Sequence, residues 1–407
     1  MLAVTIPSHV PKDLVRDFNF YTAPGMAMTP DGDPHAALAV LRELPPIFYS
    51  PQNTRDNQGT WVLTRIEDMR TVMQDHETYS SHRAIFSSAV GETWPLVPLE
   101  LDPPAHTTYR SLLNPLLSPK RVAALGDSVR NRAVELIEKF QDRGECEVMS
   151  EFAFPFAVSI FLQFLGLPQT RMKEFLNWAT KLLHPETPDE RRQAALDVIA
   201  YLDDLADQRR RVPTDDFISY VVQAEVDGKK MTAEEVRGMA VLLFIAGLDT
   251  VAAAIGFDLL HLARDQANQK LLRDEPERIP NAIEEMLRAY STVQMIRTAQ
   301  KDTELRGIQI KAGDLVCCPS MVANRDDSEY PDADRIDFDR NANRHMAFAY
   351  GVHRCLGSHL ARRELITALE EWYKRIPSFR LKQGRPPVTY GGFVFGVEEL
   401  HLEWDVA

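Results

Sequence analysis

The feature that most constrains this chain is a long helical pattern in its second half. Thr232-Ala-Glu-Glu235 has the form of a capping box, and the apolar spacing that follows it continues to about Arg264. At a rise of about 1.5 Å per residue, the pattern over 232–264 predicts a central helix roughly 50 Å long. Its apolar run VLLFIAGL is far shorter than the ~20 residues needed to cross a bilayer. We therefore expect the core helix of a soluble protein that contacts no membrane.

Helical spacing also dominates the rest of the chain, whereas strand-like segments are short. Ile47–Tyr49 and 60–64 predict a strand pair, and RTAQ, GIQI, LVCC and the HLEW tail predict further short strands. Helices are predicted over 66–74, 105–116, 119–142, 150–166, 168–182, 187–211, 215–224, 281–290 and from about 356 to 375. No repeat or Gly/Ser linker divides the chain. The predicted fold is mainly α with a minor β-sheet region, in a single domain over 1–407.

Charge and cysteine content exclude several classes of protein. The chain has 407 residues, with 46 basic and 59 acidic side chains and a net charge of −13, which disfavours a nucleic-acid partner. Only four cysteines occur and none forms a CxxC pair. They are too few for a disulfide scaffold, so we expect a reduced, cytoplasmic setting. The proline-interrupted start of the sequence offers neither a signal peptide nor a spanning helix.

One long stretch without helical or strand periodicity lies over 80–104. It carries several prolines together with Ile85, Phe86, Trp94, Leu96 and Val97. Irregular segments of this length are usually functional or disordered, and these large apolar side chains argue against disorder. We therefore expect a loop that helps to form a binding site.

The cysteine at position 355 lies in the segment HMAFAYGVHRCLGSHLARRE. Gly351 and Gly357 flank it, and a helical pattern begins immediately after it. Free N–H groups and the positive end of a helix favour a thiolate over a thiol, which suits a metal ligand or a nucleophile. A buried structural cysteine remains an equal alternative on spacing alone. For Cys146, Cys317 and Cys318 the sequence favours structural burial.

An acid and an alcohol interrupt the apolar pattern of the predicted central helix, in Ala246-Gly-Leu-Asp249-Thr250. Polar groups are costly there unless they are used. Gly247 weakens the helix, and Thr250 can bond back to a carbonyl one turn earlier, which opens a groove for a small molecule and water. The alternative is an Asp–Thr pair that satisfies itself at a kink.

Two further patterns place charged side chains on common helix faces. Glu285-Met-Leu-Arg288 puts a carboxylate and a guanidinium three residues apart, where they can pair and leave donors free to fix the segment 324–344. In LDPPAHTTYR, His106 and Arg110 are four residues apart on the first turns of a helix. Each of these is, taken singly, typical of a solvated surface charge.

Phe348-x-x-Gly351-x-x-x-Cys355-x-Gly357 resembles the haem-binding loop of the cytochrome P-450 family, in which a cysteine thiolate is the proximal iron ligand. The resemblance extends over almost the whole chain. It implies that Cys355 binds the iron of haem b and that Asp249 and Thr250 deliver protons during oxygen activation. It further implies a structural brace, Glu285 with Arg288, and a set of residues beside the haem: His106, Arg110, Arg297, His353, Phe348, Gly351, Gly357, Ala246 and Gly247.

Within this family the chain is most similar to the soluble bacterial camphor hydroxylases, through HVPKDLV, LDPPAHTTYR, AGLDTV, HLARRE and GVEEL-x-L-x-W. Trp94 stands where those enzymes have a tyrosine that binds the camphor ketone, so camphor is not expected as the substrate. Met295 stands where an acidic propionate neighbour is expected. The same matching implies pocket walls that suit a compact terpenoid or norisoprenoid with at most one polar anchor: Ile85, Trp94, Leu96, Leu99, Leu242, Ile245, Val293, Phe393 and Val394.

The resemblance implies a monooxygenase that hydroxylates a small apolar substrate with O2. No GxGxxG fingerprint occurs, so electrons are expected from a [2Fe–2S] ferredoxin and its flavoprotein reductase. The protein is expected to be a monomer, and a basic docking face is expected from Arg110, Arg121, Arg344, Arg354 and Arg362.

Two other functions for a haem-thiolate protein stay open at this point. A gas or redox sensor would need the same cysteine and cationic residues but not the Asp249–Thr250 pair. A peroxide-driven enzyme would need no electron donor. Hydrolase mechanisms are disfavoured because neither GxSxG nor HExxH occurs.

Overall fold

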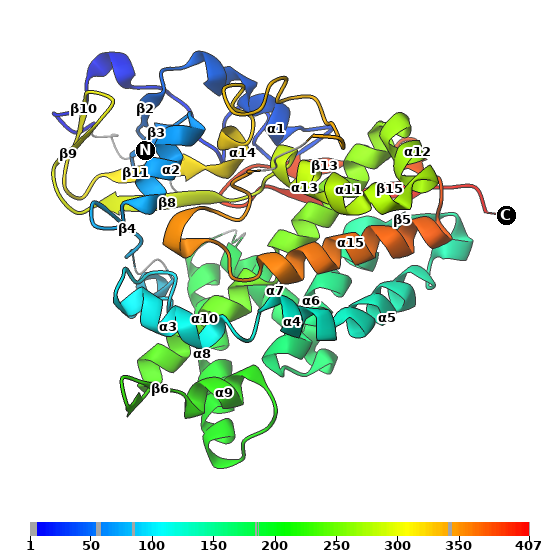
Figure 1. The fold of residues 1–407 in the computed structure, drawn as a ribbon, viewed down its shortest axis with the longest axis horizontal. Helices are drawn as coiled ribbons and strands as arrows, with labels where there is room; N and C mark the ends of the chain where they lie inside the picture. Colours follow the sequence, from blue (N-terminus) through cyan, green and yellow to red (C-terminus); the bar gives the residue numbers. More distant parts are fainter. Residues whose placement is uncertain are drawn as a thin grey trace.

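The computed structural model describes residues 6–53, 58–83, 86–183, 185, 187–340 and 344–406. Most helices gather on one side of the molecule and the largest sheet lies on the other, with α15 running between them (Figure 1). The helices are α1 Pro34–Ala37, α2 Ile66–Gln74, α3 Ala105–Leu113, α4 Pro119–Ala124, α5 Gly126–Ile137, α6 Phe154–Leu165, α7 Met172–Leu183, α8 Pro188–Arg211, α9 Phe217–Gln223, α10 Ala233–Ala246, α11 Thr250–Arg264, α12 Gln266–Asp274, α13 Ile279–Ala289, α14 Ser320–Ala323 and α15 Ser358–Arg375.

The largest sheet has the strand order β2-β3-β11-β8-β4. Its strands are β2 Ile47–Ser50, β3 Thr60–Leu63, β4 Tyr79–Ser80, β8 Gln294–Ala299 and β11 Leu315–Pro319. The predicted pair β2 and β3 is antiparallel, with Ile47 opposite Leu63. β11 runs parallel to β3 and antiparallel to β8. The strand pair and the helix at 66–74 that the sequence predicted are thus confirmed.

Among the described residues, the remaining strands form four small sheets. One sheet holds β1 Thr29–Pro30, β13 Val388–Tyr390 and β14 Gly396–Glu399, and a second holds β5 Glu145–Glu147, β12 Arg380–Leu381 and β15 His401–Glu403. Two hairpins complete the set: β6 Glu225–Val226 with β7 Lys229–Lys230, and β9 Thr303–Leu305 with β10 Ile308–Ile310.

The predicted central helix is present but is broken in the middle. The capping box is formed, because Thr232 Oγ1 accepts from the Glu235 N–H at 3.2 Å and the Glu235 carboxylate accepts from the Thr232 N–H at 2.7 Å. α10 then ends at Ala246 and α11 starts at Thr250. Gly247 packs so closely on Phe161 that a Cβ would lie 2.3 Å from the ring. Only glycine fits there, and glycine is a poor helix former, so the expectation of one continuous helix over 232–264 is corrected.

Two other predicted helices are also divided. The span 119–142 is split at Leu125, between α4 and α5, where Gly126 lowers helix propensity. The span 150–166 begins with a π-helical turn, Met149–Ala153, before α6, whose second residue Pro155 lacks the N–H that a regular α-helix would use there. The 80–104 segment contains a 3₁₀ turn, Ser87–Val90, between irregular stretches.

α11 is the buried centre of the fold. All of its residues from Val251 to Ala263 are buried, and they pack against α6, α15 and β14. The stretch Ala233–Arg264 is long and apolar enough to cross a bilayer, but 78% of its most apolar window is buried inside the protein. Such burial is typical of the core helix of a globular protein.

Candidate active site

Cys355 lies in the short connection between the 3₁₀ turn Gly351–His353 and the start of α15. Its N–H donates to the Phe348 carbonyl at 2.8 Å. Gly351 has φ of +68°, and a Cβ there would lie 2.5 Å from the Met73 carbonyl oxygen, so the cysteine loop can approach α2 only with glycine at this position. At Gly357 the nearest atom to a Cβ would be the Cys355 sulfur at 3.9 Å. Gly357 therefore leaves the space beside the sulfur open.

Cys355 differs from the other three cysteines in accessibility. Cys146, Cys317 and Cys318 are buried, as the sequence predicted, whereas Cys355 is exposed. Protein atoms nevertheless surround its sulfur, and this desolvation raises the pKa of the thiol, while the Gly357 N–H and nearby arginines oppose the rise. The N–H at the helix start thus acts in the predicted direction, and burial outweighs it. A bound metal ion, which deprotonates a coordinating thiol, would supply the missing stabilisation.

A cluster of nitrogen donors from three elements lies near Cys355. His106 and Arg110 come from α3, Arg297 from β8 and His353 from the Gly351–His353 turn. The His106 and His353 rings are 4.2 Å apart, and three of their ring nitrogens are buried without a hydrogen-bond partner among the described residues. Arg297 is only 6% exposed. The structure thus brings together the four residues that the sequence set apart as a cationic group.

The electrostatics of this donor cluster favour the binding of an anion. Burial, reinforced by the charges of Arg110 and Arg297, lowers the pKa of His353 to about 2 and that of His106 to about 4. Arg110 also donates to the Arg354 carbonyl. Buried donors that lack partners, beside two guanidinium groups, fit a ligand with carboxylate groups, as the haem propionates are. Met295, where the resemblance would place an acid, lies in β8 close to Arg297.

The predicted acid–alcohol pair lies at the break between α10 and α11. Thr250 Oγ1 donates to the Ala246 carbonyl at 3.4 Å, one turn earlier, which is the back-bond that the sequence predicted. Ala246 has an exposed side chain although most of its neighbours in α10 are buried. Asp249 is 5% exposed. Burial and the Asp249 charge together raise the pKa of Tyr390.

A cavity of about 350 Å³ extends from the donor cluster to a set of apolar walls. Arg297, His353 and Ala349 line one part of it. Six predicted pocket residues line it as well: Leu96, Leu99, Ile245, Val293, Phe393 and Val394. Ile85 lies outside the described residues. The cavity is large enough for a compact organic ligand.

Trp94 and Leu242 are not among the described residues that line this cavity, so their role as pocket walls stays a prediction. The Trp94 indole N–H donates to Glu92, and its ring lies 5.7 Å from Phe86 and under the Arg237 guanidinium. It therefore has no free donor for a ligand. Leu242 is buried in the hydrophobic cluster between the helices. Packing accounts for both side chains.

Besides the predicted Arg297 and His353, the cavity is lined by polar side chains that the sequence did not predict. Tyr21, Arg83, Glu100, Arg191 and Gln294 all line it. They come from segments far apart in the chain, and none belongs to a recognisable motif. Only the tertiary structure brings them together.

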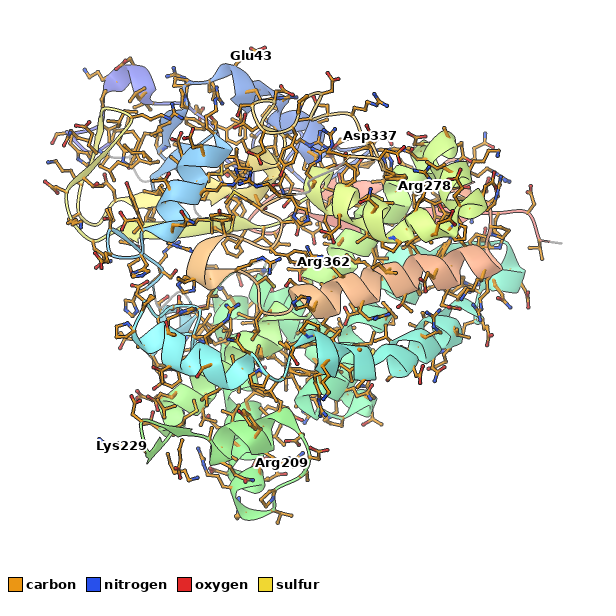
Figure 2. The ribbon with its side chains drawn as sticks, viewed as in Figure 1. Glu43, Arg209, Lys229, Arg278, Asp337 and Arg362 are labelled. Atoms are coloured by element: carbon orange, nitrogen blue, oxygen red, sulfur yellow. The ribbon has the colours of Figure 1, made fainter. Side chains whose placement is uncertain are left out.

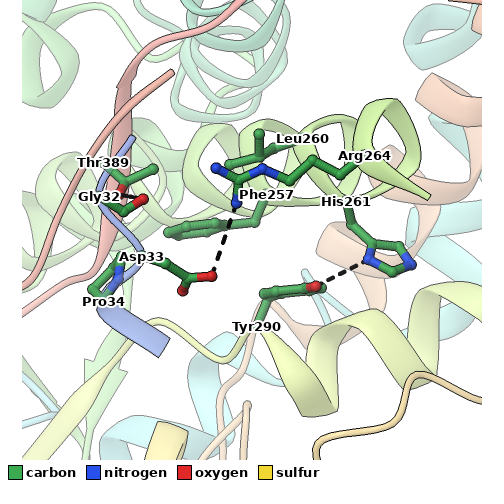
Figure 3. Close-up of a pocket in the computed structure, with 9 residues that line it drawn as sticks. All are labelled: Gly32, Asp33, Pro34, Phe257, Leu260, His261, Arg264, Tyr290 and Thr389. Carbon is green, nitrogen blue, oxygen red and sulfur yellow. Dashed lines mark hydrogen bonds and ion pairs between the residues drawn. The ribbon is translucent and has the colours of Figure 1, made fainter. Parts of the chain in front are cut away.

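A second cavity lies against α11, between Asp33, Arg264, His261 and Tyr290 (Figure 3). Arg264 faces Asp33 at 3.8 Å, and the Tyr290 hydroxyl is hydrogen-bonded to His261 Nδ1 at 2.9 Å. Its volume of about 40 Å³ is close to that of a single water molecule, so it cannot hold an organic substrate.

The Glu285–Arg288 pair is fully buried, with both side chains at 0% exposure and 2.7 Å apart. Arg288 also donates to the carbonyls of Asn324 and Ala333 at 2.7 and 2.8 Å. Arg340 adds a contact to Glu285 at 3.1 Å. The pair therefore connects α13 to the segment 324–340.

Glu284, next to the paired Glu285, has a structural role that the sequence did not predict. It accepts from His345 at 3.0 Å, at the start of the cysteine loop, and from Arg362 of α15 at 2.8 Å. Arg362 in turn lies 4.5 Å from the Phe348 ring centre. Glu284 thus joins α13, the cysteine loop and α15. The EExxR pattern at 284–288 was a usable signal, because a second acid precedes the paired one.

The five arginines predicted as a docking face differ in their exposure and in their ion pairs. Arg362 lies at the start of α15, where Glu284 holds it (Figure 2), and Arg110 is half-buried. Arg121, Arg344 and Arg354 are exposed. Arg344 lies 3.9 Å from Glu329.

One accessible cysteine beside buried donors for carboxylates is the arrangement that a haem-thiolate protein needs. Comparison with known proteins leads to the same class. The sequence pattern of the family described as Cytochrome P450 matches residues 170–393. The chain belongs to the cytochrome P450 family, and its cofactor is haem b.

Relatives of known sequence and structure match most of the chain. It is 55% identical over 401 residues to a probable cytochrome P450 127A1 of Sinorhizobium fredii, covering 98% of this chain and 97% of the relative. It is 34% identical to the mycinamicin IV hydroxylase/epoxidase of Micromonospora griseorubida, and the match covers 85% of this chain and 86% of that relative.

Two solved structures match nearly the whole chain at 34% sequence identity. CYP101J2 has a TM-score of 0.88, with 99% of this chain and 100% of that chain covered. CYP101C1 has a TM-score of 0.86, with 98% of this chain and 100% of that chain covered. The predicted family, its mainly α fold and the similarity to camphor-hydroxylase-like members are confirmed.

Proposed function

We propose that this P450 monooxygenase hydroxylates a compact, apolar terpenoid or norisoprenoid, such as an ionone-type ketone, with O2 and electrons from a ferredoxin. The observation that carries the proposal is one continuous cavity of about 350 Å³ that joins the buried donor cluster to apolar walls. Residues 1–407 act as one catalytic domain in this proposal.

The residues present fit haem b. Cys355 would hold the iron, and His106, Arg110, Arg297 and His353 would bind the propionates with donors that have few other partners. Phe348, Gly351 and Gly357 would shape the loop around the sulfur, and Ala246 and Gly247 would border the opposite face. The bound haem supplies the electron-rich iron centre at which O2 is reduced and split.

Asp249 and Thr250 would move protons to the reaction site. The Thr250 hydroxyl bonds to the Ala246 carbonyl with a long contact of 3.4 Å, so this bond is weak and the hydroxyl can reorient toward a water. Asp249 precedes it in the break between α10 and α11 and is buried. A sensor or a peroxide-driven enzyme would not need a proton source in this position. The pair therefore supports the monooxygenase over both alternatives.

The apolar walls support a hydrocarbon-rich substrate. Leu99 and Phe393 are 44% and 39% exposed although they are large and apolar. Both line the cavity, so a bound apolar molecule would remove their surface from water. A spin-state titration with ionone-type ketones, small terpenoids and camphor tests this class. Tight binding of ionone-type ketones is expected, and tighter binding of camphor than of all the others would contradict the proposal.

A [2Fe–2S] ferredoxin with its flavoprotein reductase is the proposed electron source. The exposed Arg121, Arg344 and Arg354 would attract an acidic carrier although the whole chain carries a net charge of −13. Charge reversal at Arg121 or Arg354 should slow reduction, with the effect shrinking at high salt. The matched reversal of Arg278, which Glu275 and Asp339 already neutralise, should have little effect. Unchanged rates at Arg121 and Arg354 would reject this face.

We place the protein in the cytoplasm as a monomer, with no membrane or nucleic-acid partner. Substrate-dependent consumption of reduced nicotinamide, measured with redox partners added, tests the enzyme against the sensor.

A further inference from the structure

The cavity is lined by one arginine, Arg191, that lies outside the donor cluster of the haem site and forms no ion pair with any described residue. Arg191 lies in the first turn of α8 and lines the cavity together with Leu182 of α7. Its side chain is half-buried. Its guanidinium makes no ion pair or hydrogen bond within the described part of the chain, whereas Arg209 and Arg237 of the same region are paired with Asp216 and Asp203.

Leaving a guanidinium unpaired beside apolar walls is unfavourable, because part of its hydration is lost without a compensating partner. The adjacent Glu190 pairs instead with Lys181 at 3.6 Å. The unpaired charge therefore needs a function or a ligand to account for it. A carboxylate that arrives with a substrate would satisfy it through a charge-assisted, two-pronged hydrogen bond.

The charges of the lining favour a single negative charge on that ligand. Arg297 belongs to the donor cluster of the haem site. The other charged side chains that line the cavity are Arg83, Glu100 and Arg191, so together they carry one net positive charge. Glu100 is engaged by the Leu96 N–H at 2.9 Å. The Ser81 hydroxyl, buried without a partner among the described residues and also lining the cavity, offers an additional donor.

We propose that Arg191 binds a carboxylate of the substrate and so selects compact terpenoid or norisoprenoid acids over their neutral counterparts. This inference rests on the proposed function, since it assigns the one polar anchor of that substrate class. The apolar skeleton would fill the walls formed by Val293, Phe393 and Val394. Because the protein as a whole is acidic, a local cation is needed to bind an anion against the general repulsion.

The test compares a monoterpene carboxylic acid, perillic acid, with its methyl ester by spin-state titration of the haem-replete protein. The acid is expected to bind roughly tenfold to a hundredfold more tightly than the ester. Arg191→Gln should remove that difference and leave ester binding unchanged, and Arg191→Lys should restore part of it. Calorimetric titration of the same pair gives a readout that does not depend on the iron.

Arg192→Gln is the matched control, because Arg192 is the exposed neighbour on the same helix and does not line the cavity. It should bind both compounds like the parent. Equal binding of acid and ester by the parent, or an unchanged preference in Arg191→Gln, would overturn the anion site while the monooxygenase proposal stands. If neither compound binds, nor any ionone-type ketone, the substrate class itself fails and the anion site fails with it.

Discussion

His106 and His353 pack ring to ring, with centroids 4.2 Å apart, although one comes from α3 and the other from the turn before Cys355. Both ring nitrogens of His106 and Nε2 of His353 are buried without partners among the described residues. Burial keeps both imidazoles neutral at pH 7, with pKa values of about 4 and about 2. They can therefore donate to an anionic group without adding to the charge of Arg110 and Arg297.

His106→Phe should weaken haem retention. The substitution keeps an aromatic ring against His353 but removes the donors, and a lost hydrogen bond to a charged group costs about 1.5–3 kcal/mol. Haem transfer to an acceptor protein should accordingly be roughly tenfold or more faster. His359→Phe, at an exposed position of α15, is the control. Equal transfer rates in both variants would show that His106 does not hold the haem.

Cys355→Ser should abolish the thiolate-specific Soret band of the reduced carbon monoxide complex. A serine hydroxyl is far less acidic than a thiol and donates less electron density to iron. Cys146→Ser serves as the control, because that cysteine is buried in the strand β5, remote in sequence from the cysteine loop. A retained band in Cys355→Ser would place the iron ligand elsewhere.

Thr250→Ala should uncouple electron consumption from hydroxylation, with peroxide released instead. Removing a positioned proton donor typically costs about 10²–10⁴ in rate, so product formed per reduced nicotinamide should fall roughly tenfold or more. Thr250→Ser keeps the hydroxyl that bonds to the Ala246 carbonyl and should retain most of the coupling. Coupled turnover in the alanine variant would remove Thr250 from proton delivery.

Arg288→Lys should destabilise the fold strongly. Lysine cannot reproduce the guanidinium fork that contacts Glu285 and the carbonyls of Asn324 and Ala333. Because the pair is fully buried, its disruption should lower the free energy of unfolding by about 3–5 kcal/mol. Urea unfolding measures the loss. Arg278→Lys, in a partly exposed ion pair with Glu275, should change the free energy of unfolding far less.

Glu284 should make stability depend on pH in the acid range. Although burial opposes it, hydrogen bonds from Arg362 and His345 lower the pKa of this carboxyl from 4.5 to about 2. A lowered folded-state pKa means that the stabilisation is complete above about pH 5 and is lost as the pH falls toward 2. The contribution at neutral pH is about 3 kcal/mol.

Glu284→Gln should flatten the unfolding free energy measured between pH 5 and pH 3 relative to the parent. It should also loosen the cysteine loop, because the amide gives Arg362 and His345 no charged partner. Glu135→Gln is a control, since that carboxylate is exposed and lies on α5. An identical acid profile for parent and Glu284→Gln would contradict the linkage.

The sequence predicted the elements whose causes are local. The capping box at Thr232, the strand pair and the helix at 66–74 depend on neighbouring residues, and they appear where the pattern placed them. The cysteine loop was recognisable because its glycines are fixed by close backbone approach, as Gly351 against Met73 demonstrates. Helix ends were less predictable. Gly247 breaks the central helix through its contact with Phe161, a residue far from it in sequence.

The roles of individual side chains were decided by the tertiary structure. Trp94 and Leu242 have the apolar character of pocket walls, but in the structure both pack in the hydrophobic cluster between the helices and neither is among the described residues that line the cavity. Arg191 has no local sequence signature, and its position in the cavity follows only from how α8 packs against α7, α10 and the Ser87–Val90 turn. Sequence thus determined the helices, the family and the cysteine, because these follow from short-range patterns. Which polar groups meet in the cavity depends on contacts between distant segments, which no local pattern encodes.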